Sequence, residues 1–403
     1  MTVKIRVLAD DMMPGVEACL SHWHDAQGQV PGFDITRLAG RSMNAAALHG
    51  VELLLVRSIT RVDAELLREA SALRFVGSAT IGQDHLSAEA LSHAGVAWST
   101  APGCNAQAVA EWVLATVLRQ AAGNPDMTLA ELRTRRVGVV GMGQVGRRVA
   151  ALLRALGLAV IAYDPLLTEA EKAQLPVVAW QDLTTLLSEA DIVCLHTPLT
   201  RDGPAPTYHL LNTERLALLK PSAWLINAGR GDVIAADALA AYLARPTAAT
   251  ALLDVLPHEP VPAPSIIAHC QQVSPHIAGH SLEGKWRGTW QITANAAELF
   301  GYEQVGELTD ILPAQAPPVL VWPSAGSPAL VAPYAELMAQ VIDCAGDDQR
   351  LRTAIRQYPG QASAFDDLRK HYAIRREIAA HSIRGMPAES SAQQLLNALG
   401  FCC

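Results

Sequence analysis

The opening part of the chain alternates between short apolar runs and segments in which apolar residues recur at helical spacing. The apolar runs predict strands at residues 5–9, 52–57, 74–77 and 96–99. Between them, residues 63–70 and 87–94 are predicted to be helical. Strands that alternate with helices are typical of a parallel sheet, so we expect an α/β domain here.

A second series of the same kind follows a long amphipathic segment. Residues 105–120 predict a helix that ends before the breaker formed by Gly123, Asn124 and Pro125. Further apolar runs predict six strands at residues 136–140, 159–163, 192–196, 223–227, 250–254 and 272–274. Six strands with intervening helices are typical of a doubly wound sheet.

The remainder of the chain is less regular. Residues 282–300 predict another helix, which we expect to pack on the first domain. The proline-rich stretch at residues 312–328 predicts a linker, and residues 329–403 predict a small third unit with two or three helical segments.

Composition narrows the class of protein. The 403 residues suffice for two or three domains, and a formal net charge of −8 disfavours nucleic-acid partners. The seven cysteines form no disulfide framework and no metal-ligand spacing, which favours a reducing compartment. Without a signal peptide or an apolar run near the roughly 18 residues that span a bilayer, we expect a cytoplasmic protein with no membrane partner.

A glycine-rich turn follows the strand at residues 136–140 without a gap. It contains Gly141, Gly143 and Gly146, with Gln144 and Val145 between them, and a helical segment follows. The first glycine permits a tight turn, the second lets backbone approach a pyrophosphate, and the third lets helix pack on strand. The helix N-terminus would attract the anion. The alternative is a glycine-rich turn that binds nothing.

Two residues at later strand ends favour NAD as the ligand of this turn. Asp164 closes the next strand, where its carboxylate can accept hydrogen bonds from ribose hydroxyls and would repel the 2′-phosphate of NADP. Thr197 ends another strand at the edge that borders the cofactor in such sheets, although an ordinary strand-end turn is the alternative.

Oxidation of a 2-hydroxy acid needs a cation for the carboxylate, a base for the hydroxyl proton and a hydride acceptor. Arg230 follows a strand and can grip a carboxylate in bidentate fashion, unless it is an ordinary surface arginine. His276 follows the last strand and can accept the proton, with Glu259 as the partner that fixes its tautomer. Asp254 is expected to face the nicotinamide.

These residues resemble those of the D-isomer-specific 2-hydroxyacid dehydrogenases. Within that family, the resemblance is strongest to the branch that oxidises 4-phospho-D-erythronate, through segments 101–106, 276–279, 282–285, 287–289, 365–370 and 375–377. The last two are the most specific, because other members of the family have a different tail or none.

The resemblance implies an α/β fold with two Rossmann-like doubly wound domains and a small C-terminal α+β domain. Residues 1–106 and 281–311 would form the substrate-binding, or lid, domain, residues 107–280 the NAD-binding domain, and residues 312–403 a dimerisation domain. The implied reaction oxidises 4-phospho-D-erythronate with NAD to (R)-3-hydroxy-2-oxo-4-phosphobutanoate in pyridoxal 5′-phosphate biosynthesis. The implied assembly is a homodimer.

The resemblance also implies roles for single residues. Arg230 and Glu259 would be the active-site pair and His276 the proton donor and acceptor. The expected NAD contacts, beyond the glycine turn, are Asp164, Thr197, Asp254 and Gly279. Ser58 and Thr80, each at a strand end of the first domain, would contact the substrate.

One residue departs from the family pattern, and the pattern does not say which cation binds the substrate phosphate. His280 stands where the family has a tyrosine that helps to hold the substrate, and its imidazole could still donate to a phosphate. In an acidic chain the phosphate needs a local cation, for which we predict Arg57, assisted by Lys285 or Arg287.

Two other functions fit the same residues. A sibling enzyme such as a phosphoglycerate dehydrogenase would use the same chemistry on another phosphorylated hydroxy acid. A protein that only senses NAD could keep a similar triad without turnover, although the tail offers no peptide-docking or nucleic-acid feature.

Overall fold

The computed structural model describes residues 4–314, 318–323, 327–386 and 390–402. The chain forms two compact units. The first contains Met1–Asn105 and Ser281–Ala316, and the second contains Ala106–His280 and Pro317–Cys403. The assignment of roles to three domains stays a prediction.

The first unit contains a five-stranded parallel sheet in the order β3-β1-β4-β5-β6. Its strands are β1 (Ile5–Asp10), β3 (Phe33–Leu38), β4 (Leu53–Val56), β5 (Phe75–Ser78) and β6 (Ala97–Ser99). The chain reverses its direction of growth between β1 and β4, which is the doubly wound order of flavodoxin-like sheets. Helices α1 (Val16–Leu20), α2 (Ala88–His93), α11 (Leu282–Phe300) and α12 (Leu308–Ile311) complete it, with a hairpin of β2 (Trp23–His24) and β14 (Glu303–Gln304).

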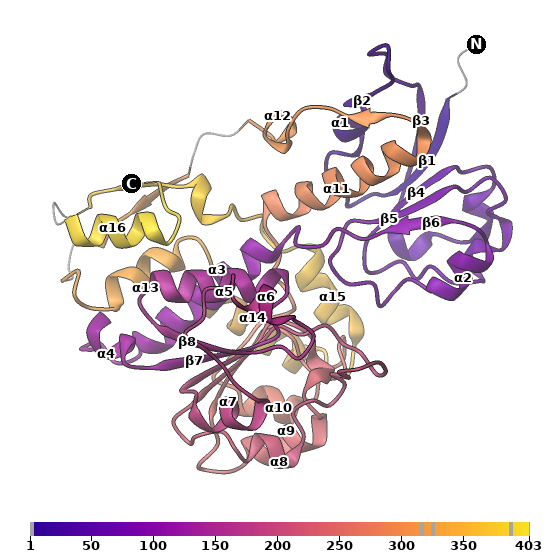
Figure 1. Ribbon diagram of the computed structural model, residues 1–403. Coiled ribbons are helices and arrows are strands. Elements are labelled where there is room, and N and C mark those ends of the chain that lie inside the picture. The colour runs from indigo at the N-terminus through magenta and orange to yellow at the C-terminus, as the bar shows by residue number, and fades with distance from the viewer. Residues whose placement is uncertain (1–3, 315–317, 324–326, 387–389, 403) are drawn as a thin grey trace. The chain divides into compact units, whose positions relative to one another are not determined.

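Helix α11 returns from late in the sequence to pack on β5 and α1 (Figure 1). Its buried Ile292, Ala296 and Ala297 join the core on one side of the sheet, so the prediction that residues 282–300 form a helix of this domain is confirmed. The predicted strands near residues 5–9, 52–57, 74–77 and 96–99 are also confirmed.

Two segments of the first unit differ from prediction. Strand β3 was not predicted, because its side chains alternate between exposed and half-buried and give no apolar run. Residues 63–70 form only the short 3-10 helix Leu66–Glu69. There the Asp63 carboxylate accepts from the backbone N–H groups of Glu65 and Leu66, each at 3.2 Å, a local bond that competes with helix formation.

The second unit contains a seven-stranded parallel sheet in the order β13-β12-β11-β10-β7-β8-β9. Its strands are β7 (Arg136–Val140), β8 (Ala159–Tyr163), β9 (Ala179–Trp180), β10 (Ile192–Leu195), β11 (Trp224–Asn227), β12 (Thr250–Leu253) and β13 (Gln272–Val273). All six predicted strands are confirmed, and β9 is an addition too short to give a signal in the sequence. The order matches the dinucleotide-binding sheet with one extra strand.

Helices lie on both faces of this sheet (Figure 1). They are α3 (Ala106–Ala121), α4 (Leu129–Arg133), α5 (Gln144–Ala155), α6 (Glu169–Lys172), α7 (Leu183–Glu189), α8 (Thr213–Leu216), α9 (Ala236–Leu243) and α10 (Pro264–His269). Short 3-10 helices occur at Gly40–Ser42, Ala45–Leu48, Gly231–Val233 and Ile378–Ala380.

The tail is more structured than predicted. The expected linker contains β15 (Val319–Val321), which pairs in parallel with β16 (Ser382–Arg384). Instead of two or three helical segments, the described tail has α13 (Ala332–Ala339), α14 (Cys344–Gln357), α15 (Ala362–Lys370) and α16 (Ser390–Ala398). A three-residue strand that pairs across some sixty residues leaves no periodic signal in the sequence.

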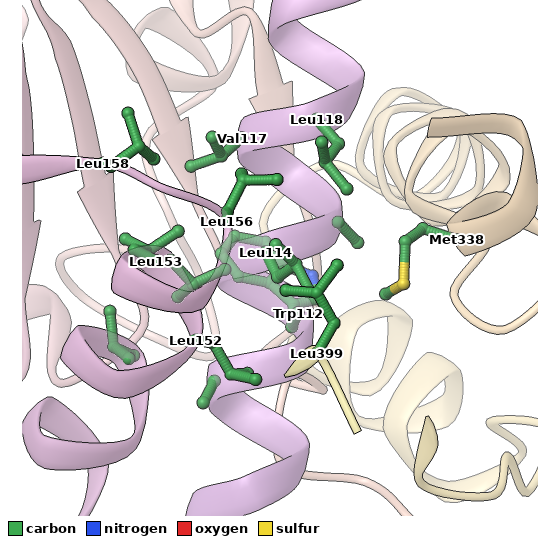
Figure 2. Packing of buried hydrophobic residues seen from close by; sticks show 14 of the residues in the cluster. Trp112, Leu114, Val117, Leu118, Leu152, Leu153, Leu156, Leu158, Met338 and Leu399 are labelled. Carbon is green, nitrogen blue, oxygen red and sulfur yellow. The ribbon is translucent and has the colours of Figure 1, made fainter. Parts of the chain in front are cut away.

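The tail shares a hydrophobic core with the dinucleotide-binding sheet. Trp112 on α3 and Leu153 on α5 pack in the same cluster as Met338 of α13 and Leu399 after α16 (Figure 2). All four side chains are at most 1% exposed. The tail therefore belongs to the same compact unit as the sheet.

Among the described residues, no helix combines the length and the apolar character needed to cross a membrane.

Candidate active site

The predicted site residues of the second unit gather at one edge of its sheet. Because all seven strands are parallel, the loops that follow them meet at their carboxyl ends. The strand order reverses between β7 and β10, and ligands of such sheets bind outside this switch point. The loops after β7, β8 and β10 carry predicted cofactor residues. Those after β11, β12 and β13 carry the predicted catalytic residues together with the predicted NAD contacts Asp254 and Gly279.

The glycine turn after β7 has the geometry that a pyrophosphate needs. Gly141 has a φ of +90°, and a Cβ on Gly146 would overlap the Gly141 carbonyl oxygen. A Cβ on Gly143, by contrast, would meet nothing within 4 Å, so this glycine leaves open space. Gly143 caps α5 and is exposed together with Gln144, while Val145 is half-buried. An anion at this helix end would meet backbone N–H groups.

Asp164 lies directly beside this turn. Its Oδ2 accepts a hydrogen bond from the backbone N–H of Met142 at 2.8 Å, and its Oδ1 accepts one from Leu166 at 3.0 Å. Each carboxylate oxygen can accept a second bond, so the two hydroxyls of a ribose fit this half-buried group. Arg147 donates from Nε to the Met142 carbonyl at 2.9 Å, which occupies part of its guanidinium within the turn.

Three buried side-chain atoms after β10 have no hydrogen-bond partner among the described residues. They are the hydroxyl of Thr197 and both ring nitrogens of His196. Burial lowers the pKa of His196 to about 3, so its imidazole is neutral. Buried polar groups are normally satisfied, and these lie at the edge where a dinucleotide would border them. We predicted Thr197 but missed His196, which reads as the last residue of an apolar strand.

His276 and Glu259 form the hydrogen-bonded pair that the sequence predicts. His276 Nδ1 lies 2.8 Å from Glu259 Oε2, and the side chains are 32% and 19% exposed, so a ligand can still reach the imidazole. The other carboxylate oxygen, Oε1, accepts from the backbone N–H of Leu256 at 2.7 Å. Because the carboxylate can only accept, Nδ1 carries the proton and Nε2 remains available as a base.

Asp254 holds the backbone around this histidine. The Asp254 carbonyl accepts from the His276 N–H at 2.8 Å, and its carboxylate accepts from Ile277 at 2.9 Å and Ala278 at 3.0 Å. The hydroxyl of Ser274 donates to the same carboxylate at 2.6 Å. Burial raises the pKa of Asp254, which is 1% exposed. This supporting role was missed. The contact of Asp254 with nicotinamide and that of half-buried Gly279 with NAD stay predictions.

Arg230 follows β11, the neighbour of β12. The buried Asn227 shapes its loop, since its side chain accepts from the Gly229 N–H and donates to the Arg230 carbonyl, both at 3.0 Å. A Cβ on Gly231 would overlap the Leu256 carbonyl, so this loop lies against the one that carries Glu259. The role of Asn227 was missed because its two bonds are made within the loop itself.

The first unit brings two of the predicted phosphate cations, Arg57 and Lys285, close together. Arg57 and Ser58 follow β4, and Thr80 follows the adjacent β5. Burial and the nearby positive charge of Arg57 lower the pKa of Lys285 to about 8. Arg287 instead donates to the Cys104 carbonyl. Lys285, one of the two predicted assistants, therefore lies within electrostatic reach of Arg57.

The histidine that departs from the family pattern lies in the second unit. His280 packs edge-on against Tyr372 of the tail, with ring centroids 5.8 Å apart. The Tyr372 hydroxyl donates to Asp347 at 3.1 Å. The contact of His280 with substrate stays a prediction.

Comparison with known proteins agrees with this geometry. A family model described as "D-isomer specific 2-hydroxyacid dehydrogenase, NAD binding domain" matches residues 105–278. A second model, described as a domain of unknown function, matches residues 330–400.

Curated relatives match almost the whole chain. Erythronate-4-phosphate dehydrogenase of Pseudomonas aeruginosa strain UCBPP-PA14 is 41% identical over 397 residues, which cover 98% of this chain and 99% of that protein. The enzyme of the same name from Azotobacter vinelandii is 40% identical with the same coverage.

A solved structure supports the fold. The D-lactate dehydrogenase of Aquifex aeolicus, complexed with NAD and lactic acid, is similar with a TM-score of 0.59. The match covers 73% of this chain and 95% of that one, at 23% identity. The chain belongs to the D-isomer-specific 2-hydroxyacid dehydrogenases, a family of NAD-dependent oxidoreductases that act on CH–OH groups, and within it to the group of its erythronate-4-phosphate dehydrogenase relatives.

Proposed function

We propose that this protein oxidises 4-phospho-D-erythronate to (R)-3-hydroxy-2-oxo-4-phosphobutanoate with NAD, a step of pyridoxal 5′-phosphate biosynthesis. The observation that carries the proposal is the His276–Glu259 pair at 2.8 Å, at the same sheet edge as the dinucleotide turn and Arg230. The name shared by relatives of about 40% identity supports the choice of substrate.

The residues divide the reaction between them. Arg230 binds the substrate carboxylate and polarises the neighbouring oxygen. His276 Nε2 takes the proton of the C2 hydroxyl while the C2–H bond breaks, and Glu259 stabilises the imidazolium that forms. NAD, when bound, accepts the hydride from C2. The products are the 2-oxo acid, NADH and a proton held by His276, which passes to solvent.

Binding of the substrate phosphate is assigned to Arg57 and Lys285, with Ser58 and Thr80 as polar neighbours. Two adjacent cations suit a dianion in a chain whose net charge is −8. Arg57→Ala should raise KM for the phosphorylated substrate about tenfold or more, the loss expected for one charged contact.

Arg61→Ala is the matched control for this change. Arg61 follows the same strand but is 85% exposed on its side chain and pairs with Asp63 at 3.1 Å, so its removal should leave KM unchanged. If Arg57→Ala behaves like Arg61→Ala, the phosphate assignment is wrong.

The assembly and location complete the proposal. We expect a homodimer through the tail, where Val319 and Val321 of β15 are 45% and 58% exposed. Sedimentation over a range of concentrations tests the dimer, and a monomer throughout would contradict it. A cytoplasmic location agrees with the free thiols of the buried cysteines and is tested by cell fractionation.

A further inference from the structure

The tail segment at residues 375–377 has no part in the mechanism described so far, yet its first residue is deeply buried. Arg375 is 8% exposed, and its side chain extends from the tail to α3 of the sheet domain. A guanidinium rarely leaves water without partners of opposite charge or several carbonyls. The groups that Arg375 contacts therefore indicate which part of the structure it supports.

Arg375 joins three parts of the second unit. Its Nη2 donates to the Ala278 carbonyl at 2.7 Å and to the Ala108 carbonyl on α3 at 2.8 Å. Its Nη1 lies 3.4 Å from Oε2 of Glu111, a carboxylate buried on α3. The other oxygen of Glu111 accepts from the Ile378 N–H at 3.0 Å, which anchors the tail segment a second time, just after Arg375.

Ala278 lies two residues after His276, in a backbone segment that needs support. His276 has a φ of +57°, a conformation unusual for a residue with a side chain. Asp254 binds the N–H groups of this segment, and Arg375 binds its Ala278 carbonyl. The backbone N–H groups of this segment are thus bound by Asp254 of the sheet domain, and its Ala278 carbonyl is bound by Arg375 of the tail.

We propose that Arg375 is a positioning residue for the catalytic loop, and that the tail domain thereby takes part in catalysis through the backbone of residues 276–278. The inference rests on the proposed role of His276. Arginine suits the task because its planar fork can bind two carbonyls and a carboxylate together, whereas lysine presents one compact ammonium. A small misplacement of a general base lowers the rate strongly, so support of this loop is felt in kcat.

The test removes both charged partners of the Arg375–Glu111 pair together, so that neither is left buried without the other. In the double variant Arg375→Met/Glu111→Gln both charges are lost at once, and the glutamine can still accept from Ile378. We expect kcat to fall about tenfold or more while Kd for NAD changes less than about threefold. Hydrogen exchange at the Ile277 and Ala278 amides should become at least about tenfold faster as the loop loosens.

Arg352→Met is the matched control. Arg352 on α14 also ties the tail to the sheet domain through two carbonyls, those of Ile267 at 2.6 Å and Cys270 at 2.7 Å, but these lie at the end of α10. Its removal should lower thermal stability without changing kcat or exchange at residues 277–278. If the double variant is unfolded by circular dichroism, Arg375→Lys carries the same test, with a smaller fall in kcat.

The inference is overturned if the double variant, or the lysine variant in its place, keeps the kcat of the Arg352→Met control. It fails alone if His276→Asn is inactive while the Arg375 variants turn over normally. If His276→Asn itself keeps its activity, the proposed function fails first.

Discussion

At the scale of single residues, the account centres on His276. Three groups hold His276 in place: Glu259 at Nδ1, Asp254 at its own backbone N–H and at those that follow it, and Arg375 at the Ala278 carbonyl. Glu259 fixes the tautomer of the imidazole, and Asp254 fixes the backbone conformation of His276. Arg375 fixes the path of the loop that follows. This arrangement suits a group that must meet one proton in one position.

His276→Asn is expected to abolish turnover and to spare cofactor binding. General acid–base catalysis contributes typically about a hundredfold or more, so kcat should fall at least by that factor. Kd for NAD should stay within about twofold, because the histidine acts on the proton and not on the dinucleotide. Stopped-flow kinetics and a fluorescence titration measure the two quantities.

His269→Asn serves as the control, because this histidine is an exposed residue of α10. Its ring lies within hydrogen-bond distance of the carbonyl of Ser265 in its own helix, 2.8 Å away, and its loss should leave kcat unchanged. A near-normal kcat for His276→Asn would refute the mechanism.

At the scale of elements, the glycines of the βα turn after β7 have different roles, because one is required for the fold and another for binding of a ligand. Gly146 is required by packing, since any side chain there would overlap the Gly141 carbonyl. Gly143 has a φ of −71° and open space around it, so the fold tolerates a side chain there. Only an approaching ligand would need that space.

The two alanine variants of this turn should therefore affect different properties, NAD binding in the first and stability in the second. Gly143→Ala should keep the melting temperature and weaken NAD binding about tenfold or more, because a methyl group would meet the pyrophosphate. Gly146→Ala should lower the free energy of unfolding by about 1–3 kcal/mol, the usual cost of overpacking. Calorimetry with a binding titration distinguishes them, and equal NAD affinity of Gly143→Ala and the parent would contradict this view of the turn.

The elements also show what the sequence could predict. Strands such as β7 and β10 are mainly apolar runs buried on both faces, and the predicted site residues Gly141 and Thr197 follow them closely, although His196, directly after β10, was missed. Strand β3 is half-exposed and β9 and β15 are too short, so neither periodicity nor length reveals them. The support that Arg375 gives to the loop after His276 was missed, because Arg375 and its partner Glu111 are 264 positions apart in the sequence.

At the scale of the whole molecule, stability should depend on pH through Glu111. Burial raises the pKa of this carboxyl from 4.5 to about 7, outweighing the opposite effect of Arg375. The folded state then holds the proton more tightly than the unfolded chain. The contribution to stability is fully present below about pH 4.5 and is lost as the pH rises through about 7.

Comparison with Glu111→Gln isolates this effect, because all other titrating groups are shared. The melting temperature of the parent should fall relative to that of the variant between pH 5 and pH 8. A constant difference over this range would mean that Glu111 ionises in the folded state as it does in the unfolded chain.

The measurement that tests the central claim most directly is kcat/KM for 4-phospho-D-erythronate against 3-phospho-D-glycerate. Both assays would contain NAD and a 2-oxo acid as a possible reoxidant of NADH. The account predicts a preference of about a hundredfold or more for the erythronate, worth about 2.7 kcal/mol of transition-state binding. An equal or reversed preference would contradict the proposed substrate, and no turnover of either would favour a protein that only senses NAD.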